Sequence, residues 1–156
     1  MKKAIKIILI SLAVILIAAQ FVRPDLSNPP ITDSERLEAA TEVPTPVGAI
    51  FERSCRDCHS NATNYPWYSQ ISPVSWWLKD HIDEGRKEMN FSVWNTYNAK
   101  KKNHKLEEIC EMVTAGEMPL PSYTWGHWDA SLSPEEVKTL CEWTRLERER
   151  LGPIEK

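Results

Sequence analysis

The feature that most constrains this chain is a Cys-x-x-Cys-His pentapeptide, CRDCH, at residues 55–59. The pattern is typical of covalent attachment of a c-type haem. The thiols of Cys55 and Cys58 would add across the two vinyl groups of the porphyrin, and the imidazole of His59 would bind the iron. Two intervening residues on one helical turn separate the sulfurs by about the distance between the vinyl groups. Because a five-residue match can occur by chance, the rest of the sequence has to support it.

The N-terminus reads as an export segment. Three lysines within residues 1–6 precede an apolar run at 7–19 that only Ser11 interrupts. Residues 1–22 are long enough for a signal anchor, a transmembrane helix with a cytoplasmic N-terminus. A cleaved signal peptide is the alternative, although residues 17–19 are an imperfect A-x-A cleavage site. The sequence favours the retained anchor.

Both versions place the cysteines outside the cytoplasm. The favoured localisation is a domain that faces the periplasm and is anchored in the inner membrane, and the alternative is a soluble exported protein. Disulfides persist in such compartments. Cys110 and Cys141 lie on the apolar faces of their expected helices, so we expect a disulfide that closes a loop of about 30 residues and stabilises the fold by about 3 kcal/mol. Two buried free thiols are the alternative.

Length and charge bound the organisation of the remaining chain. A Pro-rich segment at 23–45 is expected to be an extended linker, followed by one haem-binding domain at 46–151 and a tail at 152–156.

The net charge of the 156 residues is −3. Without the three N-terminal lysines, 16 basic residues stand against 22 acidic ones, a net charge of −6. An acidic domain argues against nucleic acid and against an anionic membrane surface as partners. It is compatible with a basic redox partner, whose identity the sequence does not give, and equally with a merely soluble surface.

The expected fold class is all-α, because no segment alternates with period two. Helices are predicted at 46–58, 73–88 and 105–115, with a short one from 93 and a last one from 134. Residues 61–70 are expected to be a loop, and residues 100–102 a solvated break. The last helix is expected to begin with a capping box at Ser133 and to face inward with Val137, Leu140, Cys141, Thr144 and Leu146. The seven tryptophans would either wall a small cytochrome c-like domain wrapped around one haem or fill an ordinary core.

The sixth iron ligand is the open question. Met118 is the first choice, because it follows a helix stop on a loop that prolines stiffen, and Met/His ligation suits electron transfer. A methionine that merely fills a gap in the core is the alternative. His81 is the second choice, since it shares a helix face with apolar residues. His104 and His127 are weaker candidates, and Met89 and Met112 are expected to be packing residues.

Several segments together resemble one known family, the bacterial haem-binding domain family. They are CRDCHSNAT at 55–63, YPWYS at 65–69, SPVSW at 72–76, HIDEGR at 81–86, NFSVW at 90–94, GEMPLPSY at 116–123 and His127, with QFVRP at 20–24 resembling the junction between anchor and linker. The resemblance covers nearly the whole chain. It implies a small exported c-type cytochrome with one covalent haem, held by Cys55 and Cys58 and ligated by His59. It says little about the physiological role or the redox partner.

The expected function is therefore extracytoplasmic electron transfer by an electron carrier rather than by an enzyme. If Met118 does not bind the iron, a five-coordinate haem could serve a gas or redox sensor or a peroxidase. A zinc or thiol-redox protein is a weaker alternative. A structural zinc site needs four ligands, and Cys110 and Cys141 do not form a second close pair.

Overall fold

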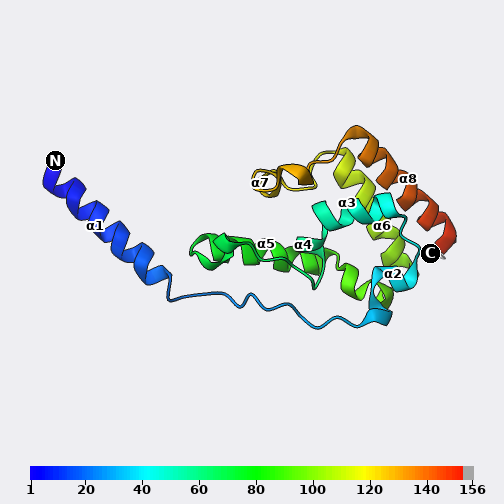
Figure 1. Cartoon of the computed structure of the whole chain (residues 1–156), viewed down its shortest axis with the longest axis horizontal. Helices are drawn as coiled ribbons and strands as arrows, with labels where there is room; N and C mark the ends of the chain where they lie inside the picture. Colours follow the sequence, from blue (N-terminus) through cyan, green and yellow to red (C-terminus); the bar gives the residue numbers. More distant parts are fainter. Residues whose placement is uncertain (153–156) are drawn as a thin grey trace.

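Helices make up all the regular structure of residues 1–152, the part of the chain that the computed structural model describes (Figure 1). The predicted all-α class is confirmed. The α-helices are α1 (Lys2–Ala19), α2 (Leu37–Ala40), α3 (Thr45–Ser54), α4 (Arg56–His59), α5 (Val74–Glu88), α6 (Ala99–Thr114), α7 (Pro121–Thr124) and α8 (Pro134–Leu151). Four 3-10 turns lie between them, namely η1 (Asp33–Glu35), η2 (Trp67–Gln70), η3 (Phe91–Thr96) and η4 (Trp128–Ala130).

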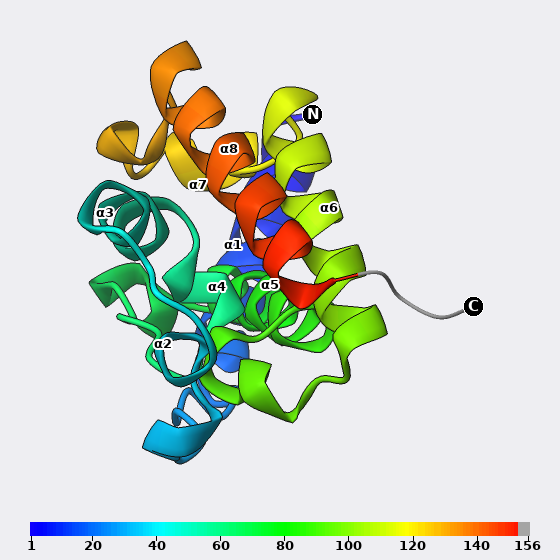
Figure 2. The same ribbon diagram turned by 90° about the vertical axis from the view of Figure 1, so that its right-hand side faces the viewer.

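The hydrophobic core lies where α6 and α8 pack side by side and α3 packs against α8 (Figure 2). Phe51 is at its centre, with ring centroids 4.7 Å from Phe91 and 5.3 Å from Trp143. Such tilted and edge-on aromatic pairs add to the stabilisation that comes from burial alone. Cys110 and Cys141, for which the sequence favours a disulfide, are bonded and join α6 to α8.

The start of α8 has the predicted capping box. The Ser133 hydroxyl accepts from the Glu136 amide, and the Glu136 carboxylate accepts from the Ser133 amide at 2.8 Å. Leu140, Trp143 and Thr144 are buried, whereas Leu146 is 49 % exposed and the prediction that it faces inward is wrong. The helical period explains the error, because Leu146 follows the buried Thr144 by two residues, about 200° around the helix, and so lies on nearly the opposite side from it.

The lysine run at 100–102 lies inside a helix, so the predicted break is wrong. Asn98 caps α6, because its side chain accepts from the Lys101 amide at 2.8 Å. The Lys101 ammonium also lies 3.8 Å from the centre of the Tyr97 ring. Long charged side chains keep their heads in water on a helix surface, and they do not end the helix.

The segment at 23–45 differs from the expected tether. Leu37, in α2, is fully buried in the core. Further upstream, the Asn28 side chain donates to the Thr63 carbonyl at 2.9 Å, and the Asn61 side chain donates to the Pro30 carbonyl at 3.1 Å. Ala40 and Val43 also pack against the core, and Glu38 forms an ion pair with Arg56, so the segment is held against the domain.

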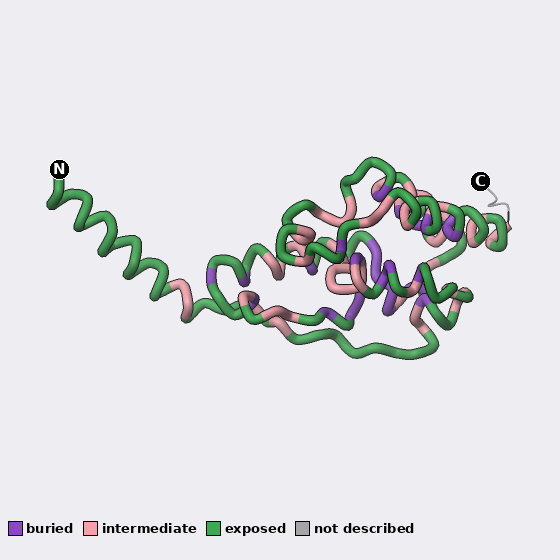
Figure 3. The backbone as a smooth tube through the Cα atoms, turned by 45° about the horizontal axis from the view of Figure 1, so that its top comes forward, coloured by how far each residue is buried: buried purple, intermediate pink, exposed green. Residues whose placement is uncertain are grey.

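The N-terminal helix α1 projects from the domain, and its residues 1–18 are exposed (Figure 3). It contains the three N-terminal lysines and ends before Phe21. None of the helices in the described part of the chain combines the length and the apolar character needed to cross a membrane, so the expected transmembrane helix is not found.

Candidate functional site

The Cys-x-x-Cys-His segment lies largely on the short helix α4, which packs closely on α5 because α5 has a glycine, Gly85, at the contact. The helix expected at 46–58 is interrupted at Cys55, where φ is −129° and ψ is −41°, so α3 ends at Ser54 and α4 carries the next four residues. Helix α4 packs on α5 at Gly85. A Cβ atom at Gly85 would lie 2.7 Å from the Cys58 carbonyl oxygen, which is too close for any other residue.

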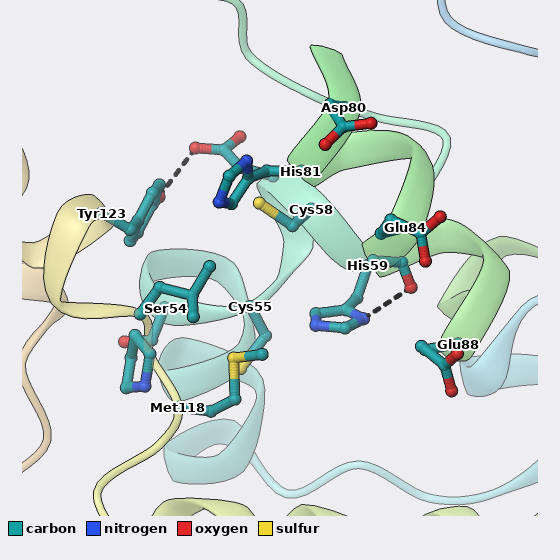
Figure 4. Close-up of a pocket in the computed structure, with 14 residues that line it drawn as sticks. Ser54, Cys55, Cys58, His59, Asp80, His81, Glu84, Glu88, Met118 and Tyr123 are labelled. Carbon is teal, nitrogen blue, oxygen red and sulfur yellow. Dashed lines mark hydrogen bonds between the residues drawn. The ribbon is translucent and has the colours of Figure 1, made fainter. Parts of the chain in front are cut away.

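The His59 side chain is held by α5 and turned toward a cavity (Figure 4). Its Nδ1 lies 2.9 Å from the Gly85 carbonyl oxygen and 3.1 Å from that of Met89. Carbonyl oxygens only accept, so Nδ1 carries the proton and Nε2 keeps a free lone pair. Burial lowers the pKa of His59 and thereby favours the neutral imidazole. A neutral histidine whose Nδ1–H is held by backbone carbonyls has the arrangement of a metal ligand.

Both cysteines of the motif line the same cavity of about 240 Å³ as His59. Burial raises the pKa of Cys55 to about 12 and that of Cys58 to about 11. The thiols are therefore protonated at neutral pH. Reactive cysteines of thiol-redox proteins have a lowered pKa instead. The arrangement argues against a thiol-redox site.

Two further cavities adjoin this one. A cavity of about 320 Å³ shares Cys55, His59 and Met118 with it and extends toward α6. A cavity of about 540 Å³ shares Cys58 and His81 and extends toward α7. Together the three form a cleft, lined mostly by apolar side chains, between α4 and α5 on one side and the segment after α6 on the other. Such a cleft suits a large, flat, apolar ligand.

Met118 enters the cleft from a loop that a helix stop sets up. The Glu117 amide donates to the Met112 carbonyl at 2.9 Å, and the Gly116 amide donates to that of Val113 at 3.3 Å. This pair of bonds is a Schellman motif. It requires the left-handed conformation that Gly116 adopts, with φ of 70°. The next residues carry the Met118 thioether into the cavity that Cys55 and His59 line (Figure 4).

The remaining candidate ligands divide into two groups. His81 lines the cleft, but its ring is tilted by 48° against the Trp77 ring, and its Nδ1 donates to the Trp77 carbonyl at 2.8 Å. His104 is exposed and lies 3.2 Å from a Glu108 oxygen, away from the cleft. His127 stacks on Tyr123 and does not line any of the three cavities. The structure therefore brings His81 to the cysteines, and leaves the other two histidines outside.

Met89 and Met112 both line the 320 Å³ cavity rather than the one that the two cysteines share. Met89 is buried in the hydrophobic core cluster, and its backbone carbonyl accepts from His59. The two side chains are consistent with the packing role expected for them.

Two polar residues outside the predicted set hold the segment in place. The Asp57 carboxylate accepts from the Tyr123 hydroxyl at 2.8 Å and from the Asn64 amide at 2.9 Å, which ties α4 to α7 across the cleft. Burial and the Asp57 carboxylate raise the pKa of Tyr123. Arg86 donates to the Ser60 carbonyl at 2.8 Å and fixes the chain after His59.

The family resemblance is the only sequence signal for these positioning residues. Its segments contain Asp57, Gly85, Arg86 and Tyr123.

For a zinc site the structure gives no support. Nowhere in residues 1–152 do three or more His, Cys, Asp or Glu side chains gather in a way that could hold a metal ion.

Comparison with protein families gives one match. The model of a family described as haem-binding domain matches residues 14–146. This span contains the pentapeptide, the cleft, Met118 and the disulfide. Searches of the curated proteins and of the solved structures give no match.

Proposed function

Because the chain belongs to the haem-binding domain family, we propose that it is a monohaem c-type cytochrome that transfers electrons outside the cytoplasm. The observation that carries the proposal is the geometry of His59. Its Nδ1–H is held by two carbonyls of the α5 end, and its free edge faces the cavity that Cys55 and Cys58 line.

The residues present fit such a cofactor. Cys55 and Cys58 are free, are spaced as the attachment pattern requires, and are protonated. Each S–H can add across one vinyl C=C bond, giving one thioether C–S bond and one C–H bond with no external oxidant. His59 supplies a neutral imidazole nitrogen. The bound haem would contribute an iron that changes between the ferric and ferrous states.

We assign the sixth ligand to Met118. Its side chain lines the cavity that Cys55 and His59 also line, and the Schellman turn at Gly116 aims its loop there. A thioether opposite an imidazole raises the haem potential, which suits an electron carrier. His81 is a poorer candidate, because it belongs to α5 and so lies on the same side of the cleft as His59, and its ring packs against Trp77.

Export is the second part of the proposal. The lysines and the apolar run of α1 support it, and so does the Cys110–Cys141 disulfide, since disulfides form in oxidising compartments. Fractionation of cells that produce the full chain tests this part. The protein should be recovered with the extracytoplasmic or membrane fraction, and recovery from the cytoplasm would contradict it.

The first experiment tests covalent attachment. The full chain is produced together with c-type haem maturation factors and extracted with acidified acetone. The haem should stay with the protein, and it should be extracted from a Cys55→Ala/Cys58→Ala variant. A Cys110→Ala/Cys141→Ala variant is the matched control, because it also lacks two cysteines but keeps the pentapeptide. Haem that leaves the unaltered protein would refute attachment.

The second experiment tests the sixth ligand. Methionine ligation gives the ferric protein a weak long-wavelength absorbance band, which Met118→Leu should abolish and the control Met112→Leu should leave in place. If the band is absent from the unaltered protein and its reduced form binds CO rapidly, the haem is five-coordinate. The sensor or peroxidase alternative would then replace electron transfer.

A further inference from the structure

The N-terminal helix is apolar on every side after its three lysines. Apart from Ser11, residues 7–19 are all aliphatic, and the large side chains from Ile7 to Ile17 are at least 44 % exposed. A helix that docks on a protein surface shows one apolar stripe, whereas a helix that is apolar all round needs an apolar surrounding. Lipid provides such a surrounding, and a single protein groove does not.

The C-terminal end of α1 is fastened to the domain. The Gln20 amide group donates to the Ser72 carbonyl at 2.8 Å and accepts from the Ser72 amide at 3.1 Å. The indole N–H of Trp76 donates to the Val22 carbonyl at 2.7 Å. These bonds hold the end of α1 at the start of α5. Any surface that receives α1 therefore also meets this end of the domain.

The same end of the domain carries exposed tryptophans. Trp67 is 78 % exposed, Trp77 is 46 % exposed and Trp125 is 92 % exposed. Val74 and Trp77 at the start of α5 line one cavity together with Trp125, which follows α7, so the two elements form one surface. Figure 1 shows the start of α5 and α7 on the side of the domain that faces α1.

We propose that this tryptophan surface, formed by Trp67, Trp77 and Trp125, docks on the headgroup layer of a lipid bilayer that holds α1. Tryptophan is the residue typical of that layer, because its ring is apolar and its N–H is polar. The domain carries net negative charge, so the contact depends on these rings rather than on attraction to anionic lipid. The inference goes beyond haem binding and electron transfer and depends on neither of them.

The test uses the full haem-loaded chain with 5-fluorotryptophan, inserted into phosphatidylcholine nanodiscs. Fluorine spectra are recorded with and without a lipid that carries gadolinium on its headgroup, so that broadening by the haem iron cancels in the comparison. The lines of Trp67, Trp77 and Trp125 should be lost with the gadolinium lipid. The buried Trp94 and Trp143 should keep theirs, which makes them internal controls. Single Trp→Phe variants assign the lines.

A Gln20→Ala variant tests the fastening without changing the tryptophans. It removes both hydrogen bonds to Ser72 but leaves the apolar run of α1 intact. The variant should still enter the nanodiscs, and the lines of Trp67, Trp77 and Trp125 should regain part of their intensity. If the gadolinium lipid leaves the lines of Trp67, Trp77 and Trp125 unchanged in the unaltered protein, or weakens the lines of Trp94 and Trp143 equally, lipid does not cover this surface. A protein partner or a second copy would then be its occupant, and the proposal would be overturned.

Discussion

His59 and Met118 reach the same cavity from walls that are held together in different ways. The histidine wall consists of α4 and α5, which pack at Gly85 and share the bonds from the His59 imidazole to two carbonyls. The methionine wall consists of the loop at 115–120 and α7. This wall is held at one end by the Schellman turn that ends α6, and at the other end by the hydrogen bond from Tyr123 to Asp57.

The difference shows which of the two proposed iron ligands, His59 or Met118, the fold itself orients. The His59 ring is oriented by backbone atoms of a packed helix pair, so its position is set before any ligand binds. Met118 lies on a loop, and loops move more easily than packed helices. We therefore expect changes in the histidine wall to affect the whole fold, and changes in the methionine wall to affect mainly the iron site.

The largest effect should come from the disulfide, which joins α6 to α8 and belongs to neither wall. A Cys110→Ala/Cys141→Ala variant opens a loop of 31 residues. Loop-closure entropy predicts a free energy of unfolding lower by about 3–4 kcal/mol. Urea unfolding of the variant and of the oxidised protein measures the difference. A change below about 1 kcal/mol would mean that the packing of α6 on α8 needs little help from the bond.

Gly85→Ala tests the histidine wall. The new Cβ would meet the Cys58 backbone, which cannot rotate away, so we expect a loss of about 2–3 kcal/mol in the free energy of unfolding together with weaker haem attachment. Gly48→Ala is the matched control, because it also changes a helical glycine and its nearest contact is at 3.8 Å. The control should be neutral or stabilising by up to about 1 kcal/mol. Equal behaviour of the two variants would contradict the close packing.

Gly116→Ala tests the aim of the methionine loop. Alanine is strained at a φ of 70°, which should lower the free energy of unfolding by about 1 kcal/mol. It should also weaken the long-wavelength absorbance band more than it weakens haem attachment. Gly126→Ala is the control, since its new Cβ would have no contact closer than 3.7 Å. If Gly116→Ala reduced attachment as strongly as Gly85→Ala does, the two walls would not differ as described.

The smallest effect concerns pH in the chain before haem attachment. The folded state lowers the pKa of His59 below its ordinary value of 6.5, so below that pH the unfolded chain binds the proton more readily. The free energy of unfolding should therefore fall as the pH drops from 6.5 toward the folded pKa, and this contribution should be absent above 6.5. His59→Gln should remove part of the decline, and the control His104→Gln should keep it. A decline unchanged in His59→Gln would assign it to other groups.

The sequence allowed the prediction of features that depend on local chemistry. The all-α class followed from the absence of period-two patterns, and the capping box at Ser133 depends only on residues three apart. The haem-binding assignment came from residues 55–59 and from the resemblance of longer segments. The family match over residues 14–146 supports this assignment.

Features that depend on tertiary approach could not be predicted in this way. Gly85 is a glycine inside a helix, and only the packing of α4 explains it. The proline-rich composition of residues 23–45 predicts a linker, yet the buried Leu37 joins that segment to the core. The run of lysines at 100–102 predicts a solvated break in the helical structure. The capping bond from Asn98, which starts α6 before these lysines, cannot be inferred from their charge.

Helix α5 sets the distance of His59, the proposed iron ligand, from the end of the domain that carries α1. Ser72 and Trp76 bind the chain that leaves α1 at the start of this helix, and Gly85 and Met89 bind His59 at its other end. Its 15 residues make a rigid spacer about 22 Å long. Insertion of one helical turn before Gly85 would raise the histidine by about 5 Å. If the proposed electron transfer takes place beside that end of the domain, the partner would then have to reach that much farther.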